Sequence, residues 1–394
     1  MPSTFPIVLA GFTAFLDLYA TQPMLPLLAH SLGVTMFAVS LTVTAPTVAV
    51  AIAAPAGGRL ADAWGRRRVI VGAAAALAFA TFMASLAGDL RQLLVWRFVQ
   101  GACTPGVFAV AIAYIHDEWP PERAGSTTAA YVSGTVVGGF VGRAVAGVVA
   151  ARMGWQDAFA VLGVLNVVSA AALWAWLPRE RRATGAGGRS GLQSAAGHLA
   201  NPRLRTTYAI GFCLLFAQVA VFTYVTFLLA APPFFLGAGA LGSLFAVYLV
   251  GAAATPPAGR WIDTHGHRAG LGLAMAVALT GLLLTLSASL WVIIAGLAVF
   301  ASGIFIGQAT ASTYLGVATA RDRGVAVGLY GTFYYAGGAA GAALPAAVWT
   351  LGGWPACVAL VALVQAATVP IAWASWRERT GPGSSLDSAF DLPA

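Results

Sequence analysis

The sequence predicts an all-α membrane protein with twelve transmembrane helices in two six-helix bundles that are related by pseudo-symmetry. Composition is the first reason, because 59% of the 394 residues are hydrophobic and only 9% are charged. A soluble domain carries about 25% charged residues, so lipid must solvate most of this surface. The second reason is a short charged loop that occurs at 58–68 and again at 259–268. A loop that returns after about 200 residues indicates two related bundles.

Each predicted helix is an apolar run of about 20 residues, the length that spans a bilayer. The first run has no small-residue cleavage site, so we interpret it as a retained helix and not as a signal peptide. In the first half, the runs predict helices over about 5–29, 36–58, 69–88, 92–115, 125–150 and 155–177. In the second half, they predict helices over about 206–230, 238–259, 269–288, 291–314, 325–350 and 354–376.

The polar stretches divide the chain into four parts. Residues 1–178 form the first bundle, 179–205 a flexible linker, 206–378 the second bundle and 379–394 a disordered tail. Within the linker, 193–200 could form a short interfacial helix. Alternate loops, with the linker and the tail, contain 17 of the 21 basic residues, all of which are arginine. Because cytoplasmic loops are rich in Lys and Arg, we expect the linker, the tail and both termini in the cytoplasm.

The distribution of charge also excludes several functions. The formal net charge is +8, but the arginines lie in short loops between apolar runs. A nucleic-acid-binding protein gathers such residues on one solvated face, so we expect no nucleic-acid partner. The three cysteines lie in apolar segments without metal-ligand spacing, and no nucleophile–base pair or phosphate loop is visible. We therefore expect no metal, no cofactor and no enzyme active site.

The first charged loop resembles the loop between helices 2 and 3 of the major facilitator superfamily, G-x-L-A-D-x-x-G-R-(K/R). The residues that match are Gly58, Leu60, Ala61, Asp62, Gly65, Arg66 and Arg67. The order of apolar segments and loops resembles the bacterial sugar- and drug-efflux branch, whose members are proton antiporters. This resemblance implies a monomeric, multi-pass protein of the inner membrane that moves a small molecule by alternating access, with protons and membrane lipids as its other partners.

In the family, the loop network locks the outward-facing state. The resemblance therefore implies a conformational gate made by Gly58, Asp62, Gly65, Arg66 and Arg67, with Asp263 as a weaker copy in the second loop. Arg66 and Arg67 offer donors to helix C-termini and to lipid phosphates. Membrane topology alone would also explain the arginines, but not Asp62, because acidic residues contribute little to that rule.

Three ionisable residues lie inside predicted helices, where a charge is costly without a partner or a purpose. Asp17 lies about 18 Å into the first helix, near the membrane midplane. A carboxyl group there can change its protonation as its surroundings become dry or wet, which proton coupling requires. We interpret Asp17 as a proton-coupling and substrate-binding residue. The alternatives are a structural ion pair and an accidental placement.

Arg97 and Gln100 belong to a stretch that resembles the helix-4 motif of the superfamily, R-x-x-Q-G, which is linked to proton coupling and to a charge in the central cavity. They are three residues apart and share one face of a helix. Because arginine keeps its proton, Arg97 would act as a fixed counter-charge to Asp17, and an anionic substrate could displace that pairing. The alternative is an arginine that extends to water at the helix end.

Arg143 follows a stripe of glycines at 134, 138 and 142, a spacing that lets another helix approach closely. The stretch resembles the helix-5 antiporter motif, G-x-x-x-G-P-x-x-G-G, but Gly139 replaces the proline and Arg143 the last glycine. The missing proline weakens the antiporter interpretation. Arg143 is as consistent with an arginine that extends to the interface as with a binding residue.

Aromatic and amide side chains in the apolar segments complete the predicted binding site, although packing explains each one, taken singly, better than ligand contact does. They are Tyr131, Gln218, Tyr224, Tyr330 and Tyr334. The leading hypothesis is a proton-coupled efflux antiporter for a small organic compound. The alternatives are an organic-anion carrier that binds its substrate with Arg97 and Arg143, a lipid-handling protein, and a non-transporting sensor.

Overall fold

The computed structural model describes residues 4–178, 180, 191–319 and 322–376, without the side chains of six of them. Throughout these ranges the chain forms helices and no strand. The first half contains α1 (Phe5–Leu16), η1 (Gln22–Met24), α2 (Leu25–Leu32), α3 (Met36–Trp64), α4 (Arg66–Ser85), α5 (Leu90–Glu118), α6 (Pro121–Met153) and α7 (Trp155–Trp176). The second half contains α8 (Gly191–Ala200), α9 (Pro202–Ala230), α10 (Ala238–Leu244), α11 (Val247–His265), α12 (His267–Leu284), α13 (Leu290–Ala318), α14 (Arg323–Ala343) and α15 (Pro345–Ser375).

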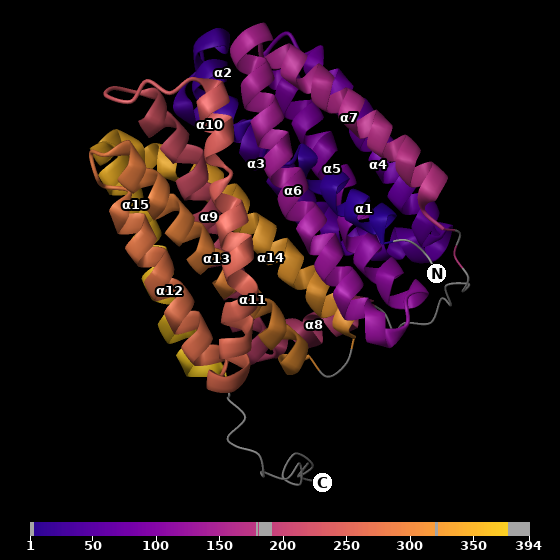
Figure 1. Ribbon diagram of the computed structural model, residues 1–394. Helices are drawn as coiled ribbons and strands as arrows, with labels where there is room; N and C mark the ends of the chain where they lie inside the picture. The colour runs from indigo at the N-terminus through magenta and orange to yellow at the C-terminus, as the bar shows by residue number, and fades with distance from the viewer. Residues whose placement is uncertain (1–3, 179, 181–190, 320–321, 377–394) are drawn as a thin grey trace.

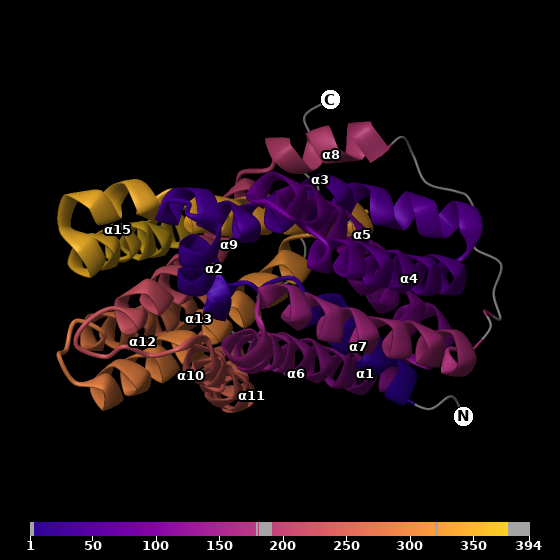
Figure 2. The same cartoon turned by 90° about the horizontal axis from the view of Figure 1, so that it is seen from above.

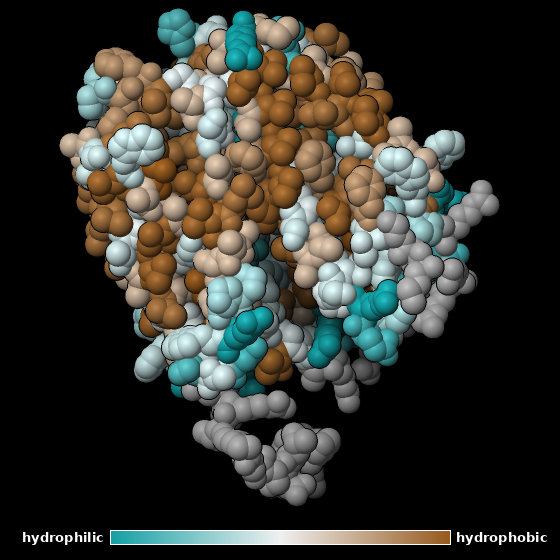
Figure 3. Space-filling view, in the orientation of Figure 1, coloured by the Kyte–Doolittle hydropathy of each residue, from teal (hydrophilic) through white to brown (hydrophobic). Residues whose placement is uncertain are grey.

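Ten helical segments of the described chain are long and apolar enough to cross a membrane. The two remaining predicted spans are the broken first one, made by α1, η1 and α2, and α14, which is rich in glycine and tyrosine. Hydrophobic side chains cover most of the face that Figure 3 shows, and hydrophilic ones gather toward the ends of the molecule. This surface is the one expected of a multi-pass membrane protein.

The helices form two bundles with the same internal pairing, as Figure 1 shows. In the first bundle α1 packs on α6, α3 on α5, and α4 on both α5 and α7. In the second, α9 packs on α14, α11 on α13, and α12 on both α13 and α15. Each pair in one half therefore has its counterpart in the other, and the predicted two-bundle fold is confirmed. The residue boundaries predicted for the four parts of the chain stay a prediction.

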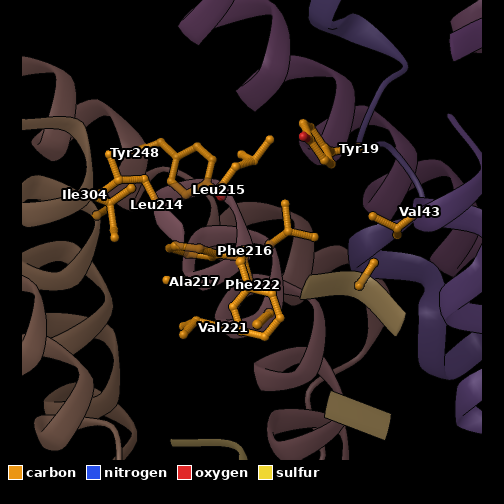
Figure 4. Close-up of a cluster of buried hydrophobic side chains, with 14 of the residues drawn as sticks. Tyr19, Val43, Leu214, Leu215, Phe216, Ala217, Val221, Phe222, Tyr248 and Ile304 are labelled. Carbon is orange, nitrogen blue, oxygen red and sulfur yellow. The ribbon is translucent and has the colours of Figure 1, made fainter. Parts of the chain in front are cut away.

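The two largest contacts between the bundles are α3 against α14 and α6 against α10. Figure 2 shows α10 beside α6. The α9 helix lies beside this interface and is buried along most of its length. Figure 4 shows its side chains between Tyr19 and Val43 of the first bundle and Tyr248 of the second. One hydrophobic core therefore extends across both bundles.

Glycines allow the closest helix pairs in each bundle. On α6, a β-carbon at Gly138 or Gly142 would meet the backbone carbonyl of Phe12 or Leu16 on α1. On α14, a β-carbon at Gly337 would likewise meet the backbone of α9. Such small-residue stripes let two backbones touch inside a membrane. The stripe predicted for α6 thus packs against the first span.

The first predicted helix, 5–29, is wrong as a continuous element. The chain leaves the helix at Asp17 and resumes in η1 and α2. Pro23 and Pro26 explain the break, because each lacks an N–H group and its ring clashes with the carbonyl four residues earlier. The predicted helix 238–259 is also divided, into α10 and α11.

The last two predicted spans differ from the structure in a smaller way. Helix α15 begins at Pro345, directly after α14, and bends at Gly352 and Gly353. That bend lies between the predicted ends at 350 and 354. The short helix predicted at 193–200 is α8, which begins two residues earlier, at Gly191. The predicted tail lies outside the described residues, and so do residues 179 and 181–190 of the predicted linker.

Single glycines connect three pairs of consecutive spans. Gly65 joins α3 to α4, Gly154 joins α6 to α7, and Gly266 joins α11 to α12. Their φ angles are +87°, +112° and +87°, a region that favours glycine because it has no β-carbon. Gly65 and Gly266 occupy equivalent positions in the two repeated loops.

Candidate functional site

The break in the first span places Asp17 inside the first bundle. Asp17 follows the last residue of α1 and is 1% exposed. Its Oδ2 atom accepts hydrogen bonds from Thr81 Oγ1 at 2.7 Å and Asn166 Nδ2 at 2.6 Å. Its Oδ1 atom is buried without a hydrogen-bond partner in the described part of the chain. One carboxyl oxygen therefore accepts hydrogen bonds from two neutral donors, and the other accepts none from the described residues.

Arg97 lies beside Asp17 but does not pair with its carboxylate. The guanidinium donates to the backbone carbonyls of Asp17 (2.9 Å), Leu18 (2.6 Å) and Thr42 (3.0 Å). Arg97 is thus a charged neighbour of Asp17, as expected, but its hydrogen bonds go to backbone carbonyls and not to the carboxylate. The reason is the break itself, because a helix end leaves carbonyls unpaired and favours a nearby positive charge.

Gln100 connects Arg97 to the carboxyl group. Its Oε1 atom accepts from Arg97 Nη1 at 2.6 Å, and its Nε2 atom donates to Thr81 Oγ1 at 2.8 Å. Thr81 in turn reaches Asp17. Arg97 is 0% exposed, so it does not extend to an interface. The sequence analysis missed Thr81 and Asn166, although an asparagine in the middle of an apolar helix was a usable signal.

Arg143 lies in a separate cluster where the two bundles meet. Its Nε atom donates to Gln22 Oε1 at 2.8 Å, and its Nη1 atom to the Gly139 carbonyl at 2.7 Å. The guanidinium carbon lies 4.9, 4.7 and 5.1 Å from the ring centroids of Tyr19, Phe245 and Tyr248. Arg143 is 4% exposed, so it is a buried cation in an aromatic box and not an interfacial arginine.

The predicted tyrosines fall into two groups. Tyr330 and Tyr334 stack with ring centroids 5.7 Å apart, and Tyr334 contacts Tyr335, which meets Phe108 of the first bundle. Tyr131 joins this group, because its hydroxyl donates to the Phe108 carbonyl at 3.3 Å. Phe108 was not among the predicted site residues.

Tyr224 and Gln218 lie on α9 but differ in their surroundings. The Tyr224 hydroxyl donates to the Ala342 carbonyl at 2.7 Å, so its polar atom is already used within the second bundle. Gln218 is 8% exposed and lies beside the Tyr248 hydroxyl, at the edge of the aromatic box. Tyr224 is thus placed for packing, and Gln218 is placed near Arg143.

The charged loop joins α3 and α4 at one end of the molecule. Arg66 donates to the Ala113 carbonyl at 2.5 Å and forms an ion pair with Asp117 of α5. Arg67 donates to the carbonyls of Trp174 (2.5 Å) and Leu177 (2.7 Å), at the end of α7. Its backbone N–H donates to Glu180 at 2.5 Å.

The other predicted gate residues are less informative. Gly58 lies within α3, and the side chain of Asp62 lies outside the described residues. Gly65 forms the joint itself, with φ at +87°. Asp263 is exposed in the second copy of the loop. The described contacts of the gate are therefore those of Arg66 and Arg67, both of which connect α4 to neighbouring helix ends.

Comparisons with known proteins agree with this architecture. The sequence matches the profile of the Major Facilitator Superfamily over residues 7–237 and 229–392. It is 30% identical over 361 residues to an uncharacterized MFS-type transporter, YybF, of Bacillus subtilis (strain 168), with 91% of this chain and 89% of the relative covered. It is 31% identical over 366 residues to the inner membrane transport protein YnfM of Escherichia coli (strain K12), with 92% and 88% covered.

Among solved structures, the fold is similar to that of a mutant of the nucleoside transporter NupG. The TM-score is 0.74 at 12% sequence identity, and the match covers 95% of this chain and 100% of the other. At that identity the likeness concerns the fold alone. The profile match, which covers nearly the whole sequence, decides the family. The chain belongs to the Major Facilitator Superfamily and is a multi-pass membrane transporter, not an enzyme.

Proposed function

We propose that this transporter is a proton-coupled efflux antiporter for a small organic compound, and that Asp17 is its proton-coupling residue. The observation that carries the proposal is the buried Asp17 carboxyl group, whose Oδ1 atom has no partner while Oδ2 accepts from Thr81 and Asn166. A membrane-embedded acid without a paired cation is costly unless it has a function.

The geometry around Asp17 suits a change of protonation. Arg97 is held by three backbone carbonyls and Gln100, so it stays in place whether Asp17 is charged or neutral. A carboxyl group that is dry in one state of the transporter and wet in the other changes its proton affinity between them. Proton and substrate can then drive the exchange only by as much as their affinities differ between the two states.

Alternating access would be achieved by rocking of the two bundles about their interface. The proposed gate consists of Arg66 and Arg67, which tie α4 to α5 and α7, together with Gly58, Gly65, Asp62 and Asp263. Opening at this end would break the contacts of both arginines with the neighbouring helix ends. The broken first span provides a place where the first bundle can bend.

The substrate would lie between the bundles. The proposed contacts near this region are Tyr131, Arg143, Gln218, Tyr330 and Tyr334. Asp17, Arg97 and Gln100, which were also predicted to bind substrate, lie inside the first bundle and would connect to it through the broken first span. Tyr224 is the weakest of the predicted binding residues, because its hydroxyl already bonds to Ala342.

We further propose that the protein works as a monomer in the bacterial inner membrane, with both termini in the cytoplasm. Helix α1 begins and α15 ends at the same end of the molecule as α8 (Figure 1). The loops at that end contain most of the arginines, as cytoplasmic loops do. The name of the Escherichia coli relative, an inner membrane transport protein, supports the location.

A second candidate function, an organic-anion carrier without proton coupling, is favoured by one observation. Arg143 is a buried cation between the bundles, and no acidic side chain of the described chain pairs with it. In that case Asp17 would belong to the gate. Arg97 contributes little to this alternative, because its donors already bond within the first bundle.

The test is proton movement in proteoliposomes that contain the full chain. Substrate panels of cations, anions and sugars are added to wild type and to Asp17→Asn, and the internal pH is followed. We expect a substrate-dependent pH change in wild type that falls at least about tenfold in Asp17→Asn, while substrate binding persists.

Asp157→Asn is the matched control, because Asp157 is an exposed acid at the start of α7 and should leave proton movement unchanged. Unchanged proton movement in Asp17→Asn would reject the coupling role. Anion transport without any proton movement in wild type would favour the carrier.

A further inference from the structure

We propose that Arg143 and Tyr19 form the binding point for the carboxylate of a singly charged organic acid, and that Gln22 occupies this point when no substrate is bound. This inference rests on the proposed transport function and names its substrate class. The transported compound would have one carboxylate and an apolar, preferably aromatic, body.

The charge of Arg143 is the first argument. The guanidinium stays protonated and is buried where the bundles meet, yet its polar partners are two neutral oxygens, from Gln22 and Gly139. Among the described residues no carboxylate forms an ion pair with it. A buried cation surrounded by neutral groups is poorly compensated, so an anion that reaches it gains a strong charge-assisted hydrogen bond.

A second, independent argument is the Tyr19 hydroxyl. The Tyr19 ring lies 4.9 Å from the Arg143 guanidinium carbon, and its hydroxyl is buried with no hydrogen-bond partner in the described chain. Buried hydroxyl groups normally find a partner. A carboxylate has two oxygens, so one can accept from Arg143 while the other accepts from Tyr19.

The size of the charge and the aromatic walls decide the ligand class. One arginine neutralises one negative charge, so a dianionic phosphate would keep an uncompensated charge in a dry site. The walls are the rings of Tyr19, Phe245 and Tyr248, which favour an apolar or aromatic body. Tyr19 and Tyr248 come from different bundles, as Figure 4 shows, so a ligand here would contact both.

Gln22 gives the site a link to the bundle interface and to the first span. Its Oε1 atom accepts from Arg143, and its Nε2 atom donates to Thr223 of α9 at 3.1 Å. A carboxylate that takes the place of Gln22 on Arg143 frees a residue that bridges the two bundles. Gln22 also lies five residues after Asp17, at the far side of the same break. Substrate binding and protonation would therefore act on one short segment.

Binding to the full-length protein in detergent tests the proposal. The probes are 3-phenylpropionate, benzoate and hexanoate, with 3-phenylpropanamide as the neutral match and phenyl phosphate as the dianion. Isothermal titration and thermal shift report the dissociation constants. In wild type we expect 3-phenylpropionate to bind at least about tenfold more tightly than its amide and than phenyl phosphate.

Four variants separate the roles of the residues. Arg143→Gln should remove the preference for the acid over the amide, and Arg143→Lys should restore part of it. Tyr19→Phe should weaken binding of the acid about three- to tenfold. Gln22→Leu should strengthen binding of the acid by a similar factor without changing the amide, because it removes the competing acceptor. A purely structural role for Gln22 would not produce that gain.

The control is Arg91→Gln, which makes the same substitution at an exposed arginine and should leave all constants unchanged. The proposal is overturned if none of the carboxylates binds wild type, if amide and acid bind equally, if phenyl phosphate binds best, or if Gln22→Leu weakens the acid. Should Arg143→Gln not fold, the Gln22→Leu and Arg143→Lys results decide. Proton coupling is measured as a pH change in proteoliposomes, and carboxylate binding as a dissociation constant in detergent. Failure of proton coupling and failure of this site are therefore distinguishable.

Discussion

The first and seventh spans hold equivalent positions in the two bundles but differ in structure. The first span is interrupted between α1 and η1, whereas α9 is a continuous helix from Pro202 to Ala230. Asp17 lies in the interruption, while α9 has no charged residue after Arg205. Both helices pack in the same way against a glycine-rich partner, α6 or α14. Both bundles share this helix packing, but of these two spans only the first has a charged residue within the membrane.

The difference shows why the buried charges lie where they do. An intact helix such as α9 satisfies its own backbone, as a membrane requires. A broken helix leaves carbonyls that need donors, and Arg97 supplies them to Asp17 and Leu18. The buried charged side chains of the described chain, Asp17, Arg97 and Arg143, are all in the first bundle. The buried charges of the described chain are therefore found in the bundle whose first span is broken.

The largest expected effect is that of Arg97→Met. The substitution removes the Arg97 donor from the carbonyls of Leu18 and Thr42, and leaves the Asp17 carbonyl with the Ala20 N–H alone. Because bonds to charged groups contribute about 1.5–3 kcal/mol each, we expect the free energy of unfolding to fall by roughly 3–5 kcal/mol. Denaturant titration in detergent micelles measures it.

Arg91→Met is the matched variant at an exposed site and should change the free energy of unfolding by less than about 0.5 kcal/mol. Equal effects at the two positions would show that the break does not depend on Arg97.

An intermediate effect is expected at the shared packing. Gly138→Ala and Gly337→Ala each place a methyl group against the backbone of the facing helix, α1 or α9. Overpacking of this kind costs about 1–3 kcal/mol, and the two losses should be similar because the two contacts are equivalent. Stability in detergent is again the measurement. Gly328→Ala meets no atom within 4 Å and should be neutral or slightly stabilising. A loss of stability in only one of these two variants would show that the two glycine contacts are not equivalent.

The smallest expected effect is that of Tyr224→Phe. The substitution removes one hydrogen bond to the Ala342 carbonyl inside the second bundle, which corresponds to about 1 kcal/mol of stability. Transport in proteoliposomes should not change. Tyr334→Phe provides the comparison, since Tyr334 lies in the group that reaches the first bundle. A transport defect in Tyr224→Phe would show that the Tyr224 hydroxyl takes part in substrate binding.

The fold was predictable because lipid imposes a simple rule on the sequence. Apolar runs of bilayer length and the repeated loop were sufficient for the two bundles. Breaks inside runs were harder to predict, since Pro23 and Pro26 interrupt the first span whereas Pro46 and Pro55 lie within the continuous helix α3. In α3, contacts with neighbouring helices satisfy the backbone carbonyls whose hydrogen bonds the prolines remove.

The candidate site was predictable in its residue types but not in its bonds. Asp17, Arg97 and Gln100 were selected because charges and amides are costly in a membrane, and they lie together. That Arg97 bonds to carbonyls depends on where the helix ends, which composition does not specify. The neighbours Thr81, Asn166 and Gln22 come from three different segments of the chain, and only the packing of those segments brings them to Asp17 and Arg143.

The single-residue joints at Gly65 and Gly266 have a consequence for how the spans move. With one residue between them, α3 and α4 have little freedom to shift separately at that end, and neither have α11 and α12. Each pair is a tight helical hairpin whose arginines lie at or beside the turn. Because both joints have positive φ angles, a residue with a β-carbon at either one would strain both helices of its hairpin at once.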